Sequence, residues 1–265
     1  MGFHSGSPHS LGLAGRSSHE LQGDGLKAFL LAAGNGTRLR PLTETIPKCL
    51  VPVRGVPLLE IWLDICRHFE IDEVLINLHA HAGSVSQFLR KNGNSVHVRV
   101  TEEPELLGSA GTLRANRSWV ASEECFWIFY ADVLNCADLQ GMLREHQRYR
   151  LVATLGVNRV PDPTRCGIVT VDEHGIICEF VEKPKHPTSN LAFSGVMLGT
   201  PRLFEFIPNC VPADIGFHVL PLLVGRMLAF PIDDYLIDIG TMENYLEAQV
   251  TWPGPRNGSL RKRES

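Results

Sequence analysis

The stretch KAFLLAAGNGTRLRPLTETIPK, residues 27–48, joins a short apolar run to a loop with two glycines and several basic residues. Its first six residues predict a strand. Gly34 and Gly36 carry no side chains, so backbone N–H groups can converge on an anion there. Arg38 and Lys48 add positive charge. The stretch therefore predicts a phosphate-binding loop at the carboxyl end of a strand.

Apolar runs and helical periods alternate on either side of this loop. Strands are expected at 27–32, 73–78, 96–101 and 125–130, and helices at 57–69, 84–91, 109–120 and 138–150. The run CFWIFY (125–130) is continuously apolar, which is typical of a strand buried on both faces of a parallel sheet. This alternation predicts an α/β fold with an open, doubly wound and mostly parallel sheet.

After residue 151 the pattern changes to strands joined by turns. Strands are expected at 151–157, 167–172, 176–182, 192–198 and 235–238, and helices at 201–206, near 217–224 and from 241. We expect a mixed sheet continuous with the first. The prediction is a single domain, 26–252, with two lobes, 26–150 and 151–252, between a disordered extension (1–25) and a flexible tail (253–265).

Composition excludes several classes of protein. The chain has 265 residues, a net charge of −4 and a pI near 6.3, so nucleic-acid or anionic-membrane binding is not expected. Seven scattered cysteines favour reduced thiols rather than disulfides or zinc. We find neither an apolar run long enough to span a bilayer nor a secretory signal, and so expect a cytoplasmic protein.

The glycine loop matches two common phosphate-binding motifs only incompletely. It has no Gly-Lys-Ser/Thr, which a P-loop requires. The dinucleotide fingerprint lacks its third glycine, because Leu39 occupies that position, and Glu60 lies inside a predicted helix rather than at a strand end. A tight strand-to-helix turn is an alternative explanation for Gly34 and Gly36, although a bare turn needs no clustered cations.

Seven motifs together give the sequence a family resemblance. In order they are LAAGNGTRLRPLT…PK (31–48), LLGSAGTL (106–113), YADVL (130–134), RCGIV (165–169), FVEKP (180–184), FSGVML (193–198) and DIGTMENY (238–245). This series resembles the sugar-1-phosphate nucleotidyltransferases, and most of all their mannose-1-phosphate guanylyltransferase-like members. The resemblance implies a Rossmann-like nucleotidyltransferase fold. It also implies in-line attack of a sugar 1-phosphate on the α-phosphate of a nucleoside triphosphate, with release of pyrophosphate.

The resemblance assigns phosphate chemistry to the glycine loop. The implied nucleotide-binding positions are Leu31, Ala33, Gly34, Asn35, Gly36, Thr37, Gly108 and Ser109. Arg38 would stabilise the departing pyrophosphate, because its guanidinium can grip phosphate oxygens at two points. Lys48, a compact charge, would lie between the α-phosphate and the sugar phosphate. The alternative is that these cations are merely solvated, and the role of Arg40 stays open.

Two aspartates are candidate metal ligands. Asp132 follows the apolar strand at 125–130, and Asp238 ends a later strand before Gly240. Two carboxylates brought together would repel unless a divalent cation lay between them, and Mg²⁺ bound by few carboxylates plus substrate phosphates fits. The alternatives are a turn-forming Asp132 and a helix N-cap at Asp238 or Thr241. Ala131 stands where the family usually has glycine.

The second lobe is expected to bind the sugar phosphate. Glu182 can accept bonds from two sugar hydroxyls and Lys183 can reach the phosphate, although a plain strand-end charge pair is the alternative. Gly167 would let a sugar approach the backbone. The family often shows Asn-Ala-Gly where this chain has Phe193-Ser194-Gly195; Ser194 is shorter and lacks the amide, so Asn190 is a candidate to substitute for it.

Glu103 is the candidate for reading the base. Some family members carry Gln here, which suits a pyrimidine such as uracil. A carboxylate only accepts hydrogen bonds, so it favours the adjacent N1–H and N2–H₂ donors of guanine and hence GTP. The alternatives are that Glu103 is merely exposed, or that Glu102 faces the site instead.

These assignments predict an enzyme that makes a nucleotide sugar from GTP and a mannose-like hexose or heptose 1-phosphate, with Mg²⁺ as cofactor. One alternative is a silent paralogue that binds nucleotide sugars and regulates a partner. Another is a relative that uses UTP, dTTP or CTP. His79 and His81 are expected to be ordinary loop residues rather than metal ligands, and a homo-oligomer is compatible with the sequence.

Overall fold

The computed structural model of the protein describes residues 25–34, 36–79, 81–92 and 96–255. Asn35, nearly all of the expected N-terminal extension (1–25) and most of the expected tail (253–265) lie outside the described residues.

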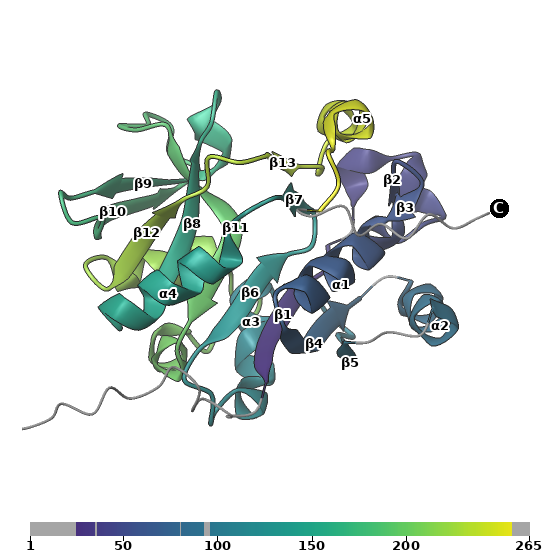
Figure 1. Ribbon diagram of the computed structural model, residues 1–265, viewed down its shortest axis with the longest axis horizontal. Coiled ribbons are helices and arrows are strands. Elements are labelled where there is room, and N and C mark those ends of the chain that lie inside the picture. Colours follow the sequence, from purple (N-terminus) through teal and green to yellow (C-terminus); the bar gives the residue numbers. More distant parts are fainter. Residues whose placement is uncertain (1–24, 35, 80, 93–95, 256–265) are drawn as a thin grey trace, which may run out of the picture.

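The described residues form one nine-stranded sheet that runs through the whole molecule (Figure 1). Seven strands lie in the order β10-β9-β11-β6-β1-β4-β5, while β8 pairs with β11 and β12 pairs with β8. The strands are β1 (Leu26–Leu31), β4 (Ile71–Leu78), β5 (His97–Glu102), β6 (Phe126–Tyr130), β8 (Ala153–Arg159), β9 (Gly167–Val171), β10 (Ile177–Glu182), β11 (Leu191–Gly199) and β12 (Met227–Pro231).

The sheet has a parallel half and a largely antiparallel half. Strand β1 lies between β4 and β6 and is parallel to both, and β4 is parallel to β5. Strand β11 is antiparallel to β6, β8 and β9, and only β12 runs parallel to its neighbour β8. The pairing of β6 with β11 joins the two halves. This mixed sheet confirms the predicted α/β class.

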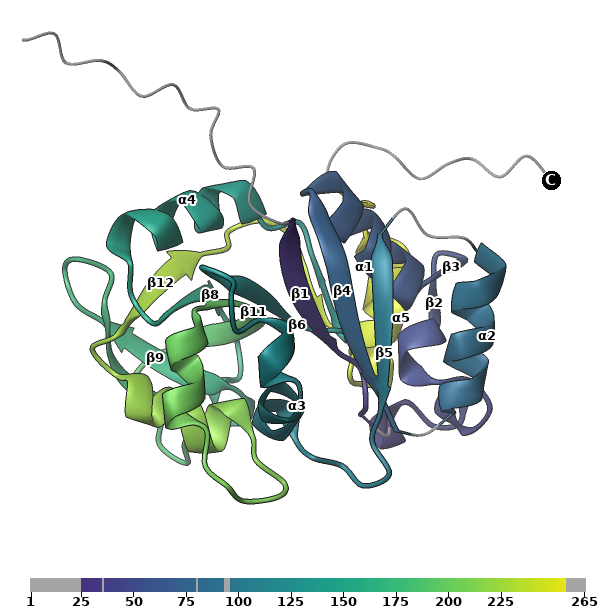
Figure 2. The same cartoon turned by 90° about the horizontal axis from the view of Figure 1, so that it is seen from below.

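Helices cover both faces of the sheet (Figure 2). They are α1 (Leu58–His68), α2 (Ala82–Asn92), α3 (Ser109–Ala115), α4 (Leu139–Tyr149) and α5 (Met242–Thr251). Side chains alternate across a strand, so Phe29 enters the hydrophobic core on the α3 face while Ala28 and Leu30 enter the core on the α1 face. Strand β6 alternates in the same way and is buried from Phe126 to Phe129, as its continuous apolar run predicted.

Some elements differ from the sequence-based expectation. The helix expected at 109–120 ends at Ala115, where the Asn116 side chain donates a hydrogen bond to the Thr112 carbonyl (3.0 Å), and a 3₁₀ turn follows at Arg117–Trp119. The helices expected at 201–206 and 217–224 are 3₁₀ and π turns. Four short strands were not expected: β12, the hairpin β2 (Pro52–Val53) and β3 (Val56–Pro57), and β7 (Val133–Asn135). Such short strands show no period of their own, and pairing with distant strands creates them.

Strand β7 pairs antiparallel with β13 (Leu236–Asp238), which brings the chain near residue 238 back beside the end of β6. Helix α5 follows β13 and returns to the β2–β3 hairpin, where the Tyr245 hydroxyl donates to the Pro52 carbonyl (3.0 Å). Among the helices of the described residues, none combines the length and the apolarity needed to cross a bilayer.

Candidate active site

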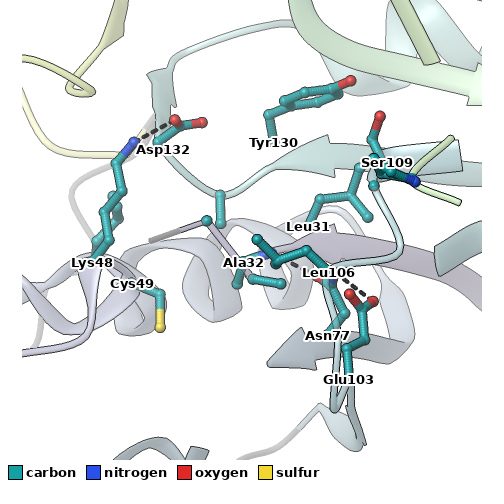
Figure 3. Close-up of a pocket in the computed structure, with 16 residues that line it drawn as sticks. Leu31, Ala32, Lys48, Cys49, Asn77, Glu103, Leu106, Ser109, Tyr130 and Asp132 are labelled. Carbon is teal, nitrogen blue, oxygen red and sulfur yellow. Dashed lines mark hydrogen bonds and ion pairs between the residues drawn. The ribbon is translucent and has the colours of Figure 1, made fainter. Parts of the chain in front are cut away.

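A pocket of about 380 Å³ lies beyond the carboxyl ends of β1, β4 and β6, where open α/β sheets bind ligands (Figure 3). Its walls are mostly apolar, while charged and polar groups lie at two ends. In Figure 3 the pair Lys48 and Asp132 lies at one end, and the pair Asn77 and Glu103 at the other. The lining residues are Leu31, Ala32, Ala33, Gly34, Lys48, Cys49, Leu58, Asn77, Glu103, Leu106, Gly108, Ser109, Tyr130, Ala131, Asp132 and Pro212.

The glycine loop leaves β1 directly into this pocket, as predicted. A Cβ built on Gly34 would meet no atom of the described residues within 4 Å, so packing does not require glycine there and a ligand can approach the backbone. Gly36 is different: its φ is +63°, its carbonyl accepts a 2.7 Å hydrogen bond from the Thr43 hydroxyl, and a Cβ would lie 2.9 Å from Thr43. Thr37 begins the 3₁₀ turn that follows and is exposed.

Lys48 and Asp132 form an ion pair at the phosphate end. The Lys48 Nζ donates to Asp132 Oδ2 at 2.5 Å, and the two side chains are only 12% and 27% exposed. Lys48 lies on a 3₁₀ turn, Lys48–Leu50, that packs against α1, whereas Asp132 follows β6. The fold thus brings together two predicted residues that are 84 positions apart in the chain.

Asp238 lies beside this pair. Strand β13 pairs Asp238 with Val133, and the Ile239 N–H donates to the Asp132 carbonyl at 2.9 Å. Burial raises the pKa of Asp238, and the negative charge of Asp132 raises it further, while Lys48 and Arg38 oppose the shift. Thr241, not Asp238, caps α5, since the Thr241 hydroxyl accepts from the Asn244 N–H.

Arg38 reaches the same cluster from the glycine loop. A Cβ on Gly240 would lie 2.8 Å from one guanidinium nitrogen of Arg38 and 2.7 Å from Asp238 Oδ1. Gly240 therefore lets an arginine and an aspartate approach one backbone position. The structure brings together four predicted charged residues: Arg38, Lys48, Asp132 and Asp238.

Two adjacent carboxylates fit a divalent cation, because oxygen donors are what Mg²⁺ prefers. Asp238 is disfavoured as an anion here, which is the situation that a bound cation relieves. Within the described part of the chain, no group of three or more His, Cys, Asp or Glu side chains is placed to hold a metal. A cation at Asp132 and Asp238 would therefore take its other ligands from phosphate oxygens or water.

Glu103 lies at the opposite end of the pocket and is buried (4% exposed), whereas Glu102 is exposed. Glu103 Oε1 accepts from Asn77 Nδ2 at 2.9 Å and from the Thr112 hydroxyl at 2.5 Å. The Leu107 N–H donates to the other oxygen, Oε2, at 3.3 Å. The alternatives of an exposed Glu103 and of Glu102 facing the pocket are both wrong.

The α3 terminus beside Glu103 is tied to a distant segment. Gly108 has a φ of +78°, and a Cβ there would lie 2.3 Å from the Ala213 carbonyl oxygen, so only glycine allows this contact. The Ser109 hydroxyl donates to Asp214 Oδ2 at 3.0 Å and accepts from the Ile215 N–H at 2.8 Å. Both predicted residues line the pocket.

Glu182 and Lys183 occupy the antiparallel half of the sheet. The Glu182 side chain is 14% exposed, and Cβ atoms on Gly167 and Gly216 would lie 2.6 and 2.4 Å from its Oε2. Burial raises the pKa of Glu182, Lys183 opposes this, and Asp214 adds to it. The Lys183 Nζ lies 3.7 Å from Glu182 Oε1 and 5.3 Å from the centre of the Phe217 ring. Gly167 thus makes room for Glu182, and also for Phe180.

Asn190 and Ser194 do not line the pocket that contains Lys48, Asp132 and Glu103. Ser194 is buried (4% exposed), and its hydroxyl accepts from the Val196 N–H at 3.3 Å and lies against Gly156. Asn190 accepts a 2.7 Å hydrogen bond from Arg159 and lines a separate, shallow groove on the outer strands. The expectation that Asn190 supplies an amide near Ser194 is therefore not supported by its position.

Three residues near the site were missed by sequence reasoning. Asn77 is a buried amide at the end of the apolar run EVLINL, and that single polar residue was the available signal. Tyr130 lines the pocket, and burial raises its pKa. Asp214 contacts Ser109 and influences Glu182, but nothing in its local sequence distinguishes it from an ordinary helix cap. The Nδ1 of His79 lies 2.7 Å from the Glu103 carbonyl oxygen, and an isolated bridge pairs His79 with His81.

Comparison with known proteins agrees with this geometry. The chain is 29% identical over 242 residues to a UTP–glucose-1-phosphate uridylyltransferase of Synechocystis, which covers 84% of this chain and 62% of that protein. It is 29% identical over 248 residues to the catalytic subunit beta of mannose-1-phosphate guanylyltransferase of Drosophila pseudoobscura, covering 92% and 66%. The chain thus spans less than two thirds of the length of these relatives.

Solved structures share the fold. A UDP-glucose pyrophosphorylase complexed with UDP-glucose superposes with a TM-score of 0.74 at 22% identity, covering 86% of this chain and 98% of that one. HddC from Yersinia pseudotuberculosis, complexed with GMP-PN, superposes with a TM-score of 0.72 at 22% identity, covering 84% and 98%. The family model described as nucleotidyl transferase matches residues 27–253, nearly the whole described fold. The resemblance found in the sequence is therefore confirmed, and the chain belongs to the nucleotidyl transferase family.

Proposed function

We propose that this protein joins a nucleoside triphosphate to a sugar 1-phosphate and releases pyrophosphate. One observation carries the proposal: Arg38, Lys48, Asp132 and Asp238 converge beside a glycine loop. Relatives named for uridylyl and guanylyl transfer to sugar 1-phosphates support it.

The reaction brings two polyanions together, so positioning and charge neutralisation are the main requirements. Backbone N–H groups near Gly34 would bind the β- and γ-phosphates. Arg38 would stabilise the pyrophosphate as it departs, and Lys48 would hold the attacking and α-phosphate oxygens. A divalent cation such as Mg²⁺, held by Asp132 and Asp238, would supply further positive charge at the phosphates.

The antiparallel half would bind the sugar phosphate. Glu182, as a carboxylate, would accept hydrogen bonds from sugar hydroxyls, and Lys183 would attract the phosphate. The Lys183 ammonium lies over the Phe217 ring, which attracts it through a cation–π interaction. We favour a mannose-like hexose or heptose as the sugar, because this choice accompanies a preference for guanine as the base.

GTP is the nucleotide that Glu103 favours. Its Oε1 accepts bonds from Asn77 and Thr112, whereas its Oε2 has a single long bond from Leu107 and can accept from a base. A carboxylate only accepts hydrogen bonds, so it suits the N1–H and N2–H₂ donors of guanine and would repel the carbonyl oxygens of uracil or thymine.

Pyrophosphate release over a matrix of the five common nucleoside triphosphates and several sugar 1-phosphates, with Mg²⁺, tests the whole proposal. We expect turnover with GTP and a manno-configured sugar 1-phosphate. A clear preference for UTP or dTTP would refute the guanine assignment but keep the reaction class. Binding of a nucleotide sugar without turnover by any pair would favour the regulatory alternative instead.

A further inference from the structure

We infer that Asn77 and Thr112 are positioning residues that fix the carboxylate of Glu103 and thereby set which base the pocket accepts. This inference rests on the proposed function, since it assumes that Glu103 faces the base. Asn77 belongs to no motif that suggested the family, and Thr112, although it lies within LLGSAGTL (106–113), had no role assigned to it there; the roles of both follow from their contacts.

The side-chain amide of Asn77 has a single orientation. The Ala32 N–H donates to Asn77 Oδ1 at 2.8 Å, so Oδ1 must be the acceptor and Nδ2 must lie on the other side. The two protons of Nδ2 then point to Glu103 Oε1 and to the Thr112 hydroxyl oxygen, both at 2.9 Å. The amide cannot flip without placing a donor against the Ala32 N–H.

The hydroxyl of Thr112 is oriented in turn. Because its oxygen accepts from Asn77, its proton is available for Glu103 Oε1 at 2.5 Å or for the Gly108 carbonyl at 3.2 Å, and the carboxylate is the nearer acceptor. Glu103 Oε1 therefore meets two donors, and the network requires an acceptor at that atom. The bonds run in one direction, from Ala32 through Asn77 and Thr112 to Glu103.

Burial makes this arrangement rigid. Asn77 and Glu103 are 4% exposed and Thr112 is fully buried, so water is a poor substitute for a lost partner. The network also connects the carboxyl ends of β1, β4 and β5 with α3. Glu103 lines the pocket (Figure 3), and its Oε2, which accepts the long 3.3 Å bond from the Leu107 N–H, has more capacity left for a ligand than Oε1, which accepts two shorter bonds.

The network thus selects which atom of residue 103 faces the ligand. With glutamate, the pocket meets Oε2, an acceptor. With glutamine, Oε1 would still have to accept from Asn77 and Thr112, so Nε2, a donor, would replace Oε2 at the pocket and the long bond from the Leu107 N–H would be lost. Asn77 and Thr112 would thus hold residue 103 in the same way in both cases. A glutamate would present an acceptor, which suits guanine, and a glutamine would present a donor, which suits a base with a carbonyl oxygen.

The ratio of kcat/KM for GTP to kcat/KM for ITP tests this inference, because inosine lacks the N2 amine that Glu103 would bind. We expect Thr112→Val, which keeps the shape but removes the hydroxyl, to lower that ratio about fivefold to tenfold. Asn77→Ala should do the same. Thr112→Ser, which keeps the hydroxyl, is the matched control and should stay within about twofold of the wild type.

A purely structural role predicts a different result. It would weaken GTP and ITP equally, leaving the ratio unchanged while lowering the melting temperature, and that outcome would overturn the inference. If turnover is absent or a variant is too weak to assay, the ratio of the calorimetric dissociation constants for GTP and ITP tests the same positioning of Glu103 through ground-state binding.

Failure of the proposed function is distinguishable. If the wild type prefers UTP, the guanine assignment is wrong, and the ratio of UTP to GTP replaces that of GTP to ITP. A changed ratio in Thr112→Val would still support positioning of Glu103, and an unchanged one would refute it. Glu103→Gln gives a second check: its effect on the ratio should shrink in the Thr112→Val background, where the amide can rotate.

Discussion

The pocket at the nucleotide end and the proposed sugar-phosphate end are built differently, and Glu182 and Lys183 are not among the residues that line that pocket. The nucleotide end lies at the carboxyl ends of β1, β4, β5 and β6, neighbours in a parallel array. The sugar-phosphate end proposed at Glu182 lies on antiparallel strands and on the irregular turns near residue 215. At the first end, the described residues predicted from sequence lie in or beside one pocket. At the second, Glu182 and Lys183 lie together, but Asn190 and Ser194 do not join them.

The difference follows from sheet geometry. Parallel strands all end at the same edge, so residues that follow them meet by topology alone. Antiparallel strands end at alternate edges, and in β11, which carries a register shift between Phe193 and Met197, Ser194 is buried like Ala192 two residues before it. Sequence order therefore locates a site more reliably in the parallel half.

The largest effect should come from breaking the charge cluster at the nucleotide end. We expect Asp132→Asn to lower kcat about a thousandfold, because Lys48 loses its partner and one candidate cation ligand is weakened. Steady-state pyrophosphate release measures it, and the melting temperature should change little. Glu173→Gln, on an exposed turn, is the control. Near-normal turnover of Asp132→Asn would remove this residue from the site.

His146 lies on α4, which packs against β8 of the antiparallel half, and should make the free energy of unfolding depend on pH. Burial lowers its pKa from 6.5 to about 4, and its Nδ1 lies 2.9 Å from the Thr154 hydroxyl. Because the pKa of His146 is lower in the folded state than in the unfolded state, the stability contributed by its neutral form is fully present above pH 6.5. That stability is lost as the pH falls toward 4. Between pH 7.5 and pH 5 the free energy of unfolding should fall by about 2 kcal/mol from this residue.

Urea unfolding at the two pH values compares the wild type with His146→Gln. The glutamine can still bond to Thr154 but does not titrate in this range, so its stability should fall less on acidification. Equal losses in the two proteins would show that other groups cause the pH dependence.

A smaller effect should distinguish the nucleotide end from the proposed sugar-phosphate end. Glu182→Gln should raise KM for the sugar 1-phosphate about tenfold, because a charged acceptor is lost, and leave KM for the nucleotide nearly unchanged. The pKa of Glu182 is raised by burial, so in the wild type the same KM should rise as pH falls through that raised pKa. The variant should lack this acidic rise. Equal changes in both KM values would contradict the division into two ends.

The smallest effect is expected at Asn190. Its side chain bonds to Arg159 in a separate groove, so Asn190→Ala should change KM for the sugar 1-phosphate by less than about twofold. A clear increase in that KM, with nucleotide KM unchanged, would return Asn190 to the sugar site and weaken the contrast between the two halves.

The sequence by itself determined the α/β class, the order of the main elements and the residues of the charge cluster. Apolar runs and helical periods were sufficient to define the elements, whereas the charged residues of the site were identified through the family motifs that contain them. The short strands β7 and β12, the truncation of α3 and the position of Asn190 were not predictable, because each depends on partners far away in the chain.

Only the tertiary structure decided how the predicted residues work together. Lys48 pairs with Asp132, Asp238 returns beside them through the β7–β13 pairing, and Glu103 is held by Asn77 and Thr112. The physical reason is that a charge or a hydrogen-bond donor has no direction until its partner is in place. Residue type shows which chemistry is available, whereas packing and pairing determine which atom faces the ligand.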